Sequence, residues 1–148
     1  MDDIDVKILR LLQQNARKTI SDLSAEIGMS MPAISERLKK LENAGVIEKY
    51  CAILNPHKLN KELIALMFVG LESPRYSDSF TEFVKGEPDI QECLYITGDF
   101  DFSLKIITQN THTLEVLLNK IKAHHGIART KTTVALSVVT SQPSIQPD

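Results

Sequence analysis

One side of the segment 30–43 combines small side chains with a group of positive charges. Apolar residues recur there at helical spacing from Ile34, so they form one stripe and leave the opposite side free. Small and polar side chains early in the segment permit close approach to base edges, and the later Lys and Arg side chains can reach phosphates. A solvated helix face would carry the same charges, so the helical context decides between the two interpretations. The predicted contacts to double-stranded DNA are Ser30, Met31, Pro32, Ala33, Ser35, Glu36, Arg37, Lys39 and Lys40.

A second group of residues suited to binding is the tetrapeptide Gly98-Asp99-Phe100-Asp101, which separates two apolar segments. Successive N–H groups of a tight turn can bind a carboxylate, and Asp99 or Asp101 could pair with an ammonium group. An α-amino acid presents both charges together. The alternative is a hairpin turn without a ligand, because Gly-Asp pairs commonly form such turns.

Side chains that catalyse reactions or bind metals do not form a recognisable set. His124 and His125 are adjacent, so on a helix they point about 100° apart and cannot chelate one ion. No nucleophile–histidine–acid set and no phosphate-binding glycine loop occurs. Cys51 and Cys93 are interpreted as small apolar residues in a reducing compartment. We therefore expect no enzymatic activity, no cofactor and no metal site.

Three short helices are predicted to position the DNA-contacting residues. Asp2 begins a helix that ends near residue 15, and a capping box at Thr19 begins a second helix that Gly28 ends. Ser30 can cap the third helix, which continues to about Gly45. Two helices joined by such a tight turn form a helix-turn-helix unit. The β-rich segment 46–54 predicts a strand beside these helices, so the unit is of the winged type.

The rest of the chain predicts a second, mixed domain. Expected strands span residues 63–71, 90–97, 102–108 and 129–139, and expected helices span residues 76–85 and 111–126. This βαββαβ order is ferredoxin-like, so the fold class is α+β and both helices cover one face of the sheet. The opposite face, if apolar, needs a partner, which self-association supplies most simply. The predicted divisions are a helix-turn-helix domain at 1–55, a linker at 56–62, the βαββαβ domain at 63–140 and a flexible tail at 141–148.

Composition is compatible with this two-domain organisation. The chain has 148 residues, of which 43% are hydrophobic, and a formal net charge of −2, so disorder is disfavoured. No uninterrupted apolar run approaches the ~18 residues of a membrane span. The chain opens on Met1-Asp2-Asp3, which is acidic where a secretory signal needs positive charge. We therefore expect a cytoplasmic protein, associated with the nucleoid if it binds DNA.

Several stretches resemble the Lrp/AsnC (leucine-responsive, or feast/famine) transcription regulators, and the resemblance covers roughly residues 2–140. One departure is Asn60, where the family usually has Gly, although Asn also tolerates positive φ. The resemblance implies dimerisation through the sheets, further assembly up to octamers, and a small effector, usually an amino acid, bound between dimers. It also implies that Asp101, Thr132 and Thr133 contact the effector. The matching stretches are Asp5-Val6-Lys7-Ile8-Leu9, Asn15-Ala16-Arg17, Leu38-Lys39-Lys40-Leu41-Glu42, Gly45-Val46-Ile47 and Gly98-Asp99-Phe100-Asp101.

The function predicted from the sequence is therefore that of a sequence-specific DNA-binding regulator modulated by a small effector. Paired recognition helices would enter successive major grooves roughly 34 Å apart. One alternative is an architectural protein that wraps DNA without an effector. Another is a tetrapyrrole decarboxylase of similar two-domain build, which needs basic and His residues. Residues 61–148 offer few of these, since they carry eight Lys/Arg against eleven Asp/Glu.

Overall fold

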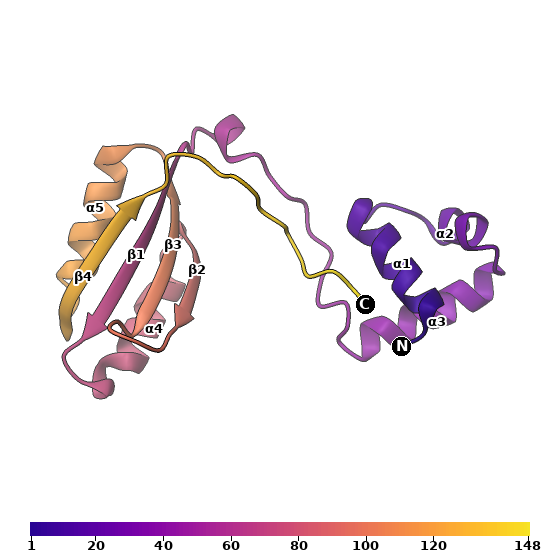
Figure 1. Ribbon diagram of the computed structural model, residues 1–148, viewed down its shortest axis with the longest axis horizontal. Helices are drawn as coiled ribbons and strands as arrows, with labels where there is room; N and C mark the ends of the chain where they lie inside the picture. Colours follow the sequence, from indigo (N-terminus) through magenta and orange to yellow (C-terminus); the bar gives the residue numbers. More distant parts are fainter. The chain divides into compact units, whose positions relative to one another are not determined.

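A computed structural model describes all 148 residues and divides them into two compact units. Residues 1–54 and 140–148 form the first unit, and residues 55–139 form the second (Figure 1). None of the helices has both the length and the apolar content that crossing a bilayer requires.

The first unit contains the three predicted helices: α1 (Asp3–Gln14), α2 (Ile20–Ile27) and α3 (Met31–Asn43). The capping box predicted at Thr19 is present, and Asp2, predicted to begin α1, forms one as well, because each accepts from the backbone N–H three residues later. Gly28 ends α2 in the left-handed conformation, with φ of 80°. Ser30 occupies the N-cap of α3 but makes no side-chain capping bond, contrary to the sequence prediction. The buried core of the three helices comprises Ile8, Leu12, Leu23, Ile34 and Leu41.

The strand predicted at residues 46–54 is wrong. No other segment of the chain pairs with these residues, and Tyr50, Ile53 and Leu54 are exposed. Strand propensity reflects packing against a neighbouring strand, so a β-rich segment without such a neighbour stays irregular. Cys51 lies in this segment with a free, exposed thiol.

The second unit is a four-stranded antiparallel sheet with the strand order β2-β3-β1-β4. Helices α4 (Ser77–Lys85) and α5 (Thr111–Lys122) lie behind it in Figure 1 and cover one face, as predicted. The structure confirms the ferredoxin-like order of elements. Short 3₁₀ helices occur at Pro56–Leu59 and Pro74–Tyr76. The strands are β1 (Leu63–Leu71), β2 (Ile90–Tyr95), β3 (Phe102–Thr108) and β4 (Ile127–Val134).

Alternation along the central strands places the core of this unit between the sheet and the two helices. Ala65, Met67 and Val69 alternate along β1 and are fully buried. They pack with the apolar faces of the helices, which contribute Phe80 and Ile121 among others. Cys93 on β2 is half-buried against the same core, and burial raises the pKa of its thiol.

The end of the last strand differs from its prediction, and the C-terminal tail follows it. β4 ends at Val134 rather than at residue 139, and Leu136 beyond it is fully exposed. The tail, for which flexibility stays a prediction, contacts α1, where Arg10 Nη2 donates to the carbonyl of Pro147 at 3.1 Å. Gln13 Nε2 donates to the carbonyl of Ile145 at 2.5 Å.

A polar network joins the linker to the sheet. The buried Thr108 hydroxyl donates to Asp89 Oδ2 at 2.6 Å and lies 2.8 Å from the Thr113 hydroxyl. Lys61 forms an ion pair with Asp89. Burial alone would raise the pKa of Asp89, but the bonds from Lys61 and Thr108 outweigh it, so the pKa lies below its ordinary value of 3.8.

Replacing Asp89 with asparagine is expected to remove a pH-dependent part of the stability of the sheet unit. Because the folded-state pKa of Asp89 is lowered, its contribution is present above the unfolded pKa and is lost as pH falls through the folded pKa. The difference in unfolding free energy between wild type and Asp89→Asn should therefore be largest near neutral pH and shrink below about pH 4. Urea denaturation monitored by circular dichroism from pH 7 to pH 2.5 measures it. A constant difference over this range would contradict the prediction.

Candidate DNA-binding surface and ligand-binding turn

The outer face of α3 is available to a duplex. Ile34 and Leu41 are buried beneath it, while the residues on the other side of the helix reach solvent, as the apolar stripe predicts. Ala33, Ser35 and Arg37 are half-buried at its margins. The exposed residues of this segment, from the N-cap onwards, include Ser30, Met31, Pro32, Glu36, Lys39, Lys40 and Asn43.

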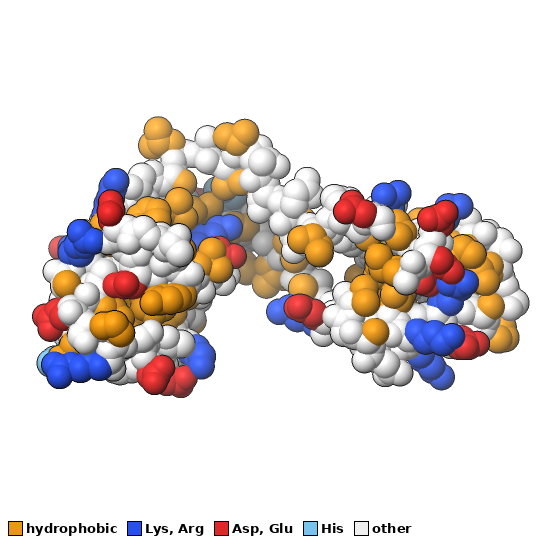
Figure 2. Space-filling view, turned by 60° about the horizontal axis from the view of Figure 1, so that its bottom comes forward, with side chains coloured by type: hydrophobic (Ala, Val, Ile, Leu, Met, Phe, Trp, Pro, Cys, Tyr) orange, Lys and Arg blue, Asp and Glu red, His pale blue; other side chains and the backbone are white.

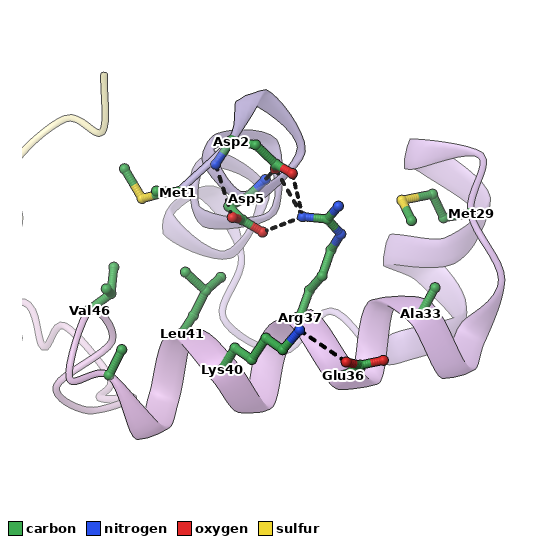
Figure 3. A pocket seen from close by; sticks show the side chains of 11 residues that line it. Met1, Asp2, Asp5, Met29, Ala33, Glu36, Arg37, Lys40, Leu41 and Val46 are labelled. Atoms are coloured by element: carbon green, nitrogen blue, oxygen red, sulfur yellow. Dashed lines mark hydrogen bonds and ion pairs between the residues drawn. The ribbon is translucent and has the colours of Figure 1, made fainter.

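The three basic side chains of α3 have different partners. Lys40 pairs with Glu36 one turn earlier at 3.0 Å, and both side chains are mostly exposed. Lys39 forms no ion pair. Arg37 reaches across to the start of α1, where Nη1 contacts Asp2 and Asp5 (Figure 3). Of the three cations, Lys39 is thus the one whose charge has no carboxylate partner.

Arg37 therefore occupies a different place from the one predicted for a phosphate contact. Its Nη1 donates to Asp2 Oδ2 and to Asp5 Oδ1, both at 2.8 Å. These bonds raise the pKa of Arg37, and the backbone N–H of Asp5, followed by the Arg37 guanidinium, lowers the pKa of Asp2. Sequence inspection missed this pairing because 32 residues or more separate the partners. The signal in the sequence that could have indicated this pairing was the presence of carboxylates at the start of the first helix and of basic residues on the third.

The turn between β2 and β3 has the shape that the sequence predicts. Gly98 adopts a φ of 108°, which side-chain-bearing residues rarely accept, and Asp99 is exposed. Asp101 fixes the turn to β1: its N–H donates to the carbonyl of Val69 at 2.9 Å, and its carboxylate accepts from the N–H of Leu71 at 2.7 Å. Asp101 thus has a structural role, and Asp99 is the freer of the two carboxylates.

The aromatic ring of Phe100 in this turn contacts a cation, the guanidinium of Arg129. This ring lies 5.8 Å from the ring of Phe68, and the Arg129 guanidinium lies 4.8 Å from its centroid. Arg129 crosses directly above Gly70, where an added Cβ would come within 2.9 Å of the Arg129 Cγ. Sequence analysis did not identify Arg129, because only the pairing of β1 with β4 places it beside Gly70.

Within one chain, Thr132 and Thr133 do not lie at this turn, with which the family resemblance grouped them as effector contacts. Thr132 pairs with the buried Met67 and Thr133 with the exposed Leu66, so their side chains leave opposite faces of the sheet. Leu66 and Val69, which holds the turn, are three residues apart, roughly 10 Å along the strand. Of the two threonines, only Thr133 lies on the same open face of the sheet as Arg129.

The adjacent histidines pack on aromatic rings just beyond α5. The His124 ring lies 4.9 Å from the ring of Phe83, and His125 meets Tyr76 edge-on at 4.8 Å. His124 Nε2 also lies 3.4 Å from the Ser79 hydroxyl. These contacts give both imidazole rings a packing role next to the end of α5.

Known protein families match both parts of the chain. Residues 1–48 match the family model for winged helix-turn-helix DNA-binding domains, and residues 64–145 match that for the Lrp/AsnC ligand binding domain. The HTH-type transcriptional regulator YezC of Bacillus subtilis, itself described as uncharacterized, is 36% identical over 144 residues, covering 97% of this chain and 99% of its own.

Solved structures match over almost the whole chain. A transcriptional regulator of Neisseria meningitidis in complex with L-methionine is 28% identical, with a TM-score of 0.93 over 98% of this chain and 96% of that one. The feast or famine regulatory protein of Mycobacterium tuberculosis, also in complex with L-methionine, is 27% identical, with a TM-score of 0.89 and 99% coverage of both chains. The chain belongs to the Lrp/AsnC family, and it is a transcriptional regulator with a DNA-binding and a ligand-binding domain rather than an enzyme.

Proposed function

We propose that α3 enters the major groove and reads base edges with the first two turns of its outer face. The observation that supports this most directly is the exposed face of α3 above a buried apolar stripe. Small side chains there permit close approach, and Lys39 and Lys40 reach the flanking phosphates. The proposed base-proximal residues are Ser30, Met31, Pro32, Ala33, Ser35 and Glu36.

Selection of binding sequences tests this assignment. We expect the wild-type chain to enrich a defined site from a pool of random duplexes. Its affinity for that site should exceed its affinity for a random duplex by about 10³-fold or more at physiological salt. Equal affinities with similar steep salt dependences would instead indicate an architectural protein that wraps DNA.

The proposed effector is an amino acid, bound beside the turn at Gly98–Asp101. Two relatives of similar structure were solved with L-methionine. The Arg129 guanidinium suits a carboxylate and the exposed Asp99 suits an ammonium group, so the two charges of an α-amino acid have candidate partners here. Arg129 replaces Thr132 in this proposal, because Thr132 faces the helices.

One or more of the twenty amino acids is expected to raise the thermal midpoint of unfolding. A ligand at 100 times its Kd stabilises the folded state by about 2.7 kcal/mol, which is roughly 10 °C or more for a domain of this size. Arg129→Gln should abolish the shift, whereas Lys131→Gln on the same strand and face should retain it. If no amino acid changes the midpoint, the effector assignment fails while the DNA assignment stands.

The open face of the sheet is proposed to bind a second copy of the chain. Leu66 and Leu94 are exposed, and Phe68 is half-buried beside them, on the side away from the helices. Figure 2 shows hydrophobic side chains at the surface of this unit among charged ones. Dimers would associate further, up to octamers. An effector bound between dimers would act by binding one assembly more tightly than another. We also propose that the protein associates with the nucleoid.

A further inference from the structure

Three charged residues tie the start of α1 to the middle of α3, and we call Asp2, Asp5 and Arg37 the acid–arginine cluster. Arg37 Nη1 lies 2.9 and 2.8 Å from the two carboxylate oxygens of Asp2, and 2.8 Å from Asp5 Oδ1. The side chains of Asp5 and Arg37 are only 16% and 26% exposed, so water competes weakly for this contact. Figure 3 shows the guanidinium extended from α3 to both carboxylates.

The same two carboxylates also close the first turn of α1. Asp2 Oδ1 accepts from the N–H groups of Ile4 and Asp5, both at 3.0 Å. Asp5 Oδ2 in turn accepts from the N–H of Asp2 at 3.0 Å. These capping bonds hold both side chains in place, so Arg37 meets a preformed acceptor. A rotation of α3 about its axis would break the bonds of Arg37 to both carboxylates.

The carboxylates of Asp2 and Asp5 also neutralise the positive charge of Arg37. Two carboxylates face one guanidinium, so the cluster as a whole carries one negative charge and offers no net attraction to phosphate. Apolar contacts hold α3 only along the narrow stripe that includes Ile34 and Leu41. The contact with Asp2 and Asp5 is the ion pairing that joins α3 to α1.

We propose that Arg37 is a positioning residue for DNA recognition. Held by Asp2 and Asp5, it sets the rotation of α3 on α1 and thereby directs the base-proximal side chains, and it does not contact phosphate. The inference rests on the proposed function of α3, and it replaces the phosphate contact that the sequence assigns to Arg37.

Salt titrations on two duplexes distinguish positioning from phosphate binding. The full-length protein is assayed on a duplex that the wild type has selected from a random pool, and on a random duplex of equal length. On the random duplex, Lys39→Ala should reduce the slope of log affinity against log salt by about 0.9, the value of one lost phosphate contact, and Arg37→Ala should leave it unchanged. On the selected duplex, Arg37→Ala should lose at least tenfold in affinity. A reduced slope for Arg37→Ala on the random duplex, as contact through its other guanidinium nitrogens would cause, overturns the proposal.

A pair of isosteric variants gives a second test that depends on the sign of the effect. Asp5→Asn keeps an oxygen that can cap α1 but removes the charge that holds Arg37. Asp3→Asn removes one charge from the same turn, where Asp3 is exposed and contacts neither Arg37 nor the capping groups. Positioning predicts that Asp5→Asn binds the selected duplex at least fivefold more weakly than Asp3→Asn. If Asp5 merely competed with DNA for Arg37, Asp5→Asn would bind more tightly than Asp3→Asn, and the proposal would be overturned.

One further variant tests whether Asp5 and Arg37 act through the same contact. The double variant Asp5→Asn/Arg37→Ala should bind the selected duplex as weakly as Arg37→Ala alone, because both changes break one network. Additive losses would contradict this. If the wild type selects no duplex, the proposed function of α3 fails. If the wild type selects a duplex but the slope or sign results go the other way, only the positioning role fails.

Discussion

Leu66→Arg is expected to convert the assembled protein into monomers at micromolar concentration. Leu66 lies on the open face of β1, 41% exposed, opposite Lys105 on β3. A second copy packed on this face would bury the new charge without a partner, beside a charge of the same sign. An unpaired buried charge costs about 3–5 kcal/mol, so the dimer Kd should rise about 10³-fold. In a two-fold interface the substitution occurs twice, which increases the effect.

Light scattering and sedimentation velocity measure this result. Val116→Arg is the matched control, because Val116 is 55% exposed on α5, which covers the other face of the sheet. It introduces the same charge and should leave the assembly intact. If Leu66→Arg remained assembled while Val116→Arg dissociated, the helical face would be the interface. A wild-type protein that is monomeric at the same concentration would refute the proposed self-association altogether.

Gly126→Ala is expected to destabilise the sheet unit by about 3 kcal/mol. Gly126 has a φ of 88°, a conformation that costs an alanine roughly 1 kcal/mol. An added Cβ would lie 2.2 Å from Cγ of the Tyr76 ring, and such overpacking typically costs about 1–3 kcal/mol more. The thermal midpoint should fall by roughly 15 °C.

A control and a double variant separate the two causes. Gly86 has an ordinary φ of −82°, and a Cβ there would meet only the carbonyl of Phe83 at 3.4 Å, so Gly86→Ala should change stability little. Removing the Tyr76 ring should relieve the clash but not the backbone strain. Tyr76→Ala combined with Gly126→Ala should therefore be at least 1 kcal/mol more stable than the sum of the single changes predicts. Simple additivity would show that the ring moves aside without cost.

Features that depend on residues close in sequence were predicted well. The helix start at Asp2 and the capping box at Thr19 depend on residues three positions apart, and the structure confirms both. The predicted bounds of β1 and β3 also agree, because turn residues flank these apolar segments. Asn60, which stands where the family usually has Gly, adopts the left-handed conformation with φ of 57°.

Features that depend on distant residues were predicted poorly. The segments 46–54 and 135–139 have strand-like composition, but strand formation needs a neighbour, and the sequence does not show that none is present. The site residues follow the same pattern. Arg37 was predicted beside the apolar stripe of α3 as a phosphate contact, but its pairing with Asp2 and Asp5 depends on the packing of α1 against α3. The sequence did not indicate Arg129, which we propose as a ligand contact, or the face on which Thr132 lies, because both depend on the pairing of β4 with β1.

The unequal environments of the two thiols make the natural chain suitable for labelling at a single position. Cys51 is exposed, whereas Cys93 is half-buried with a raised pKa, so at neutral pH a maleimide should react much faster with Cys51. A fluorophore or spin label could thus be attached near residue 54, where the first stretch of the first unit ends, without any mutation. Its anisotropy or inter-probe distance would then follow the response of the connecting segment to DNA and to amino acids in the unmodified sequence.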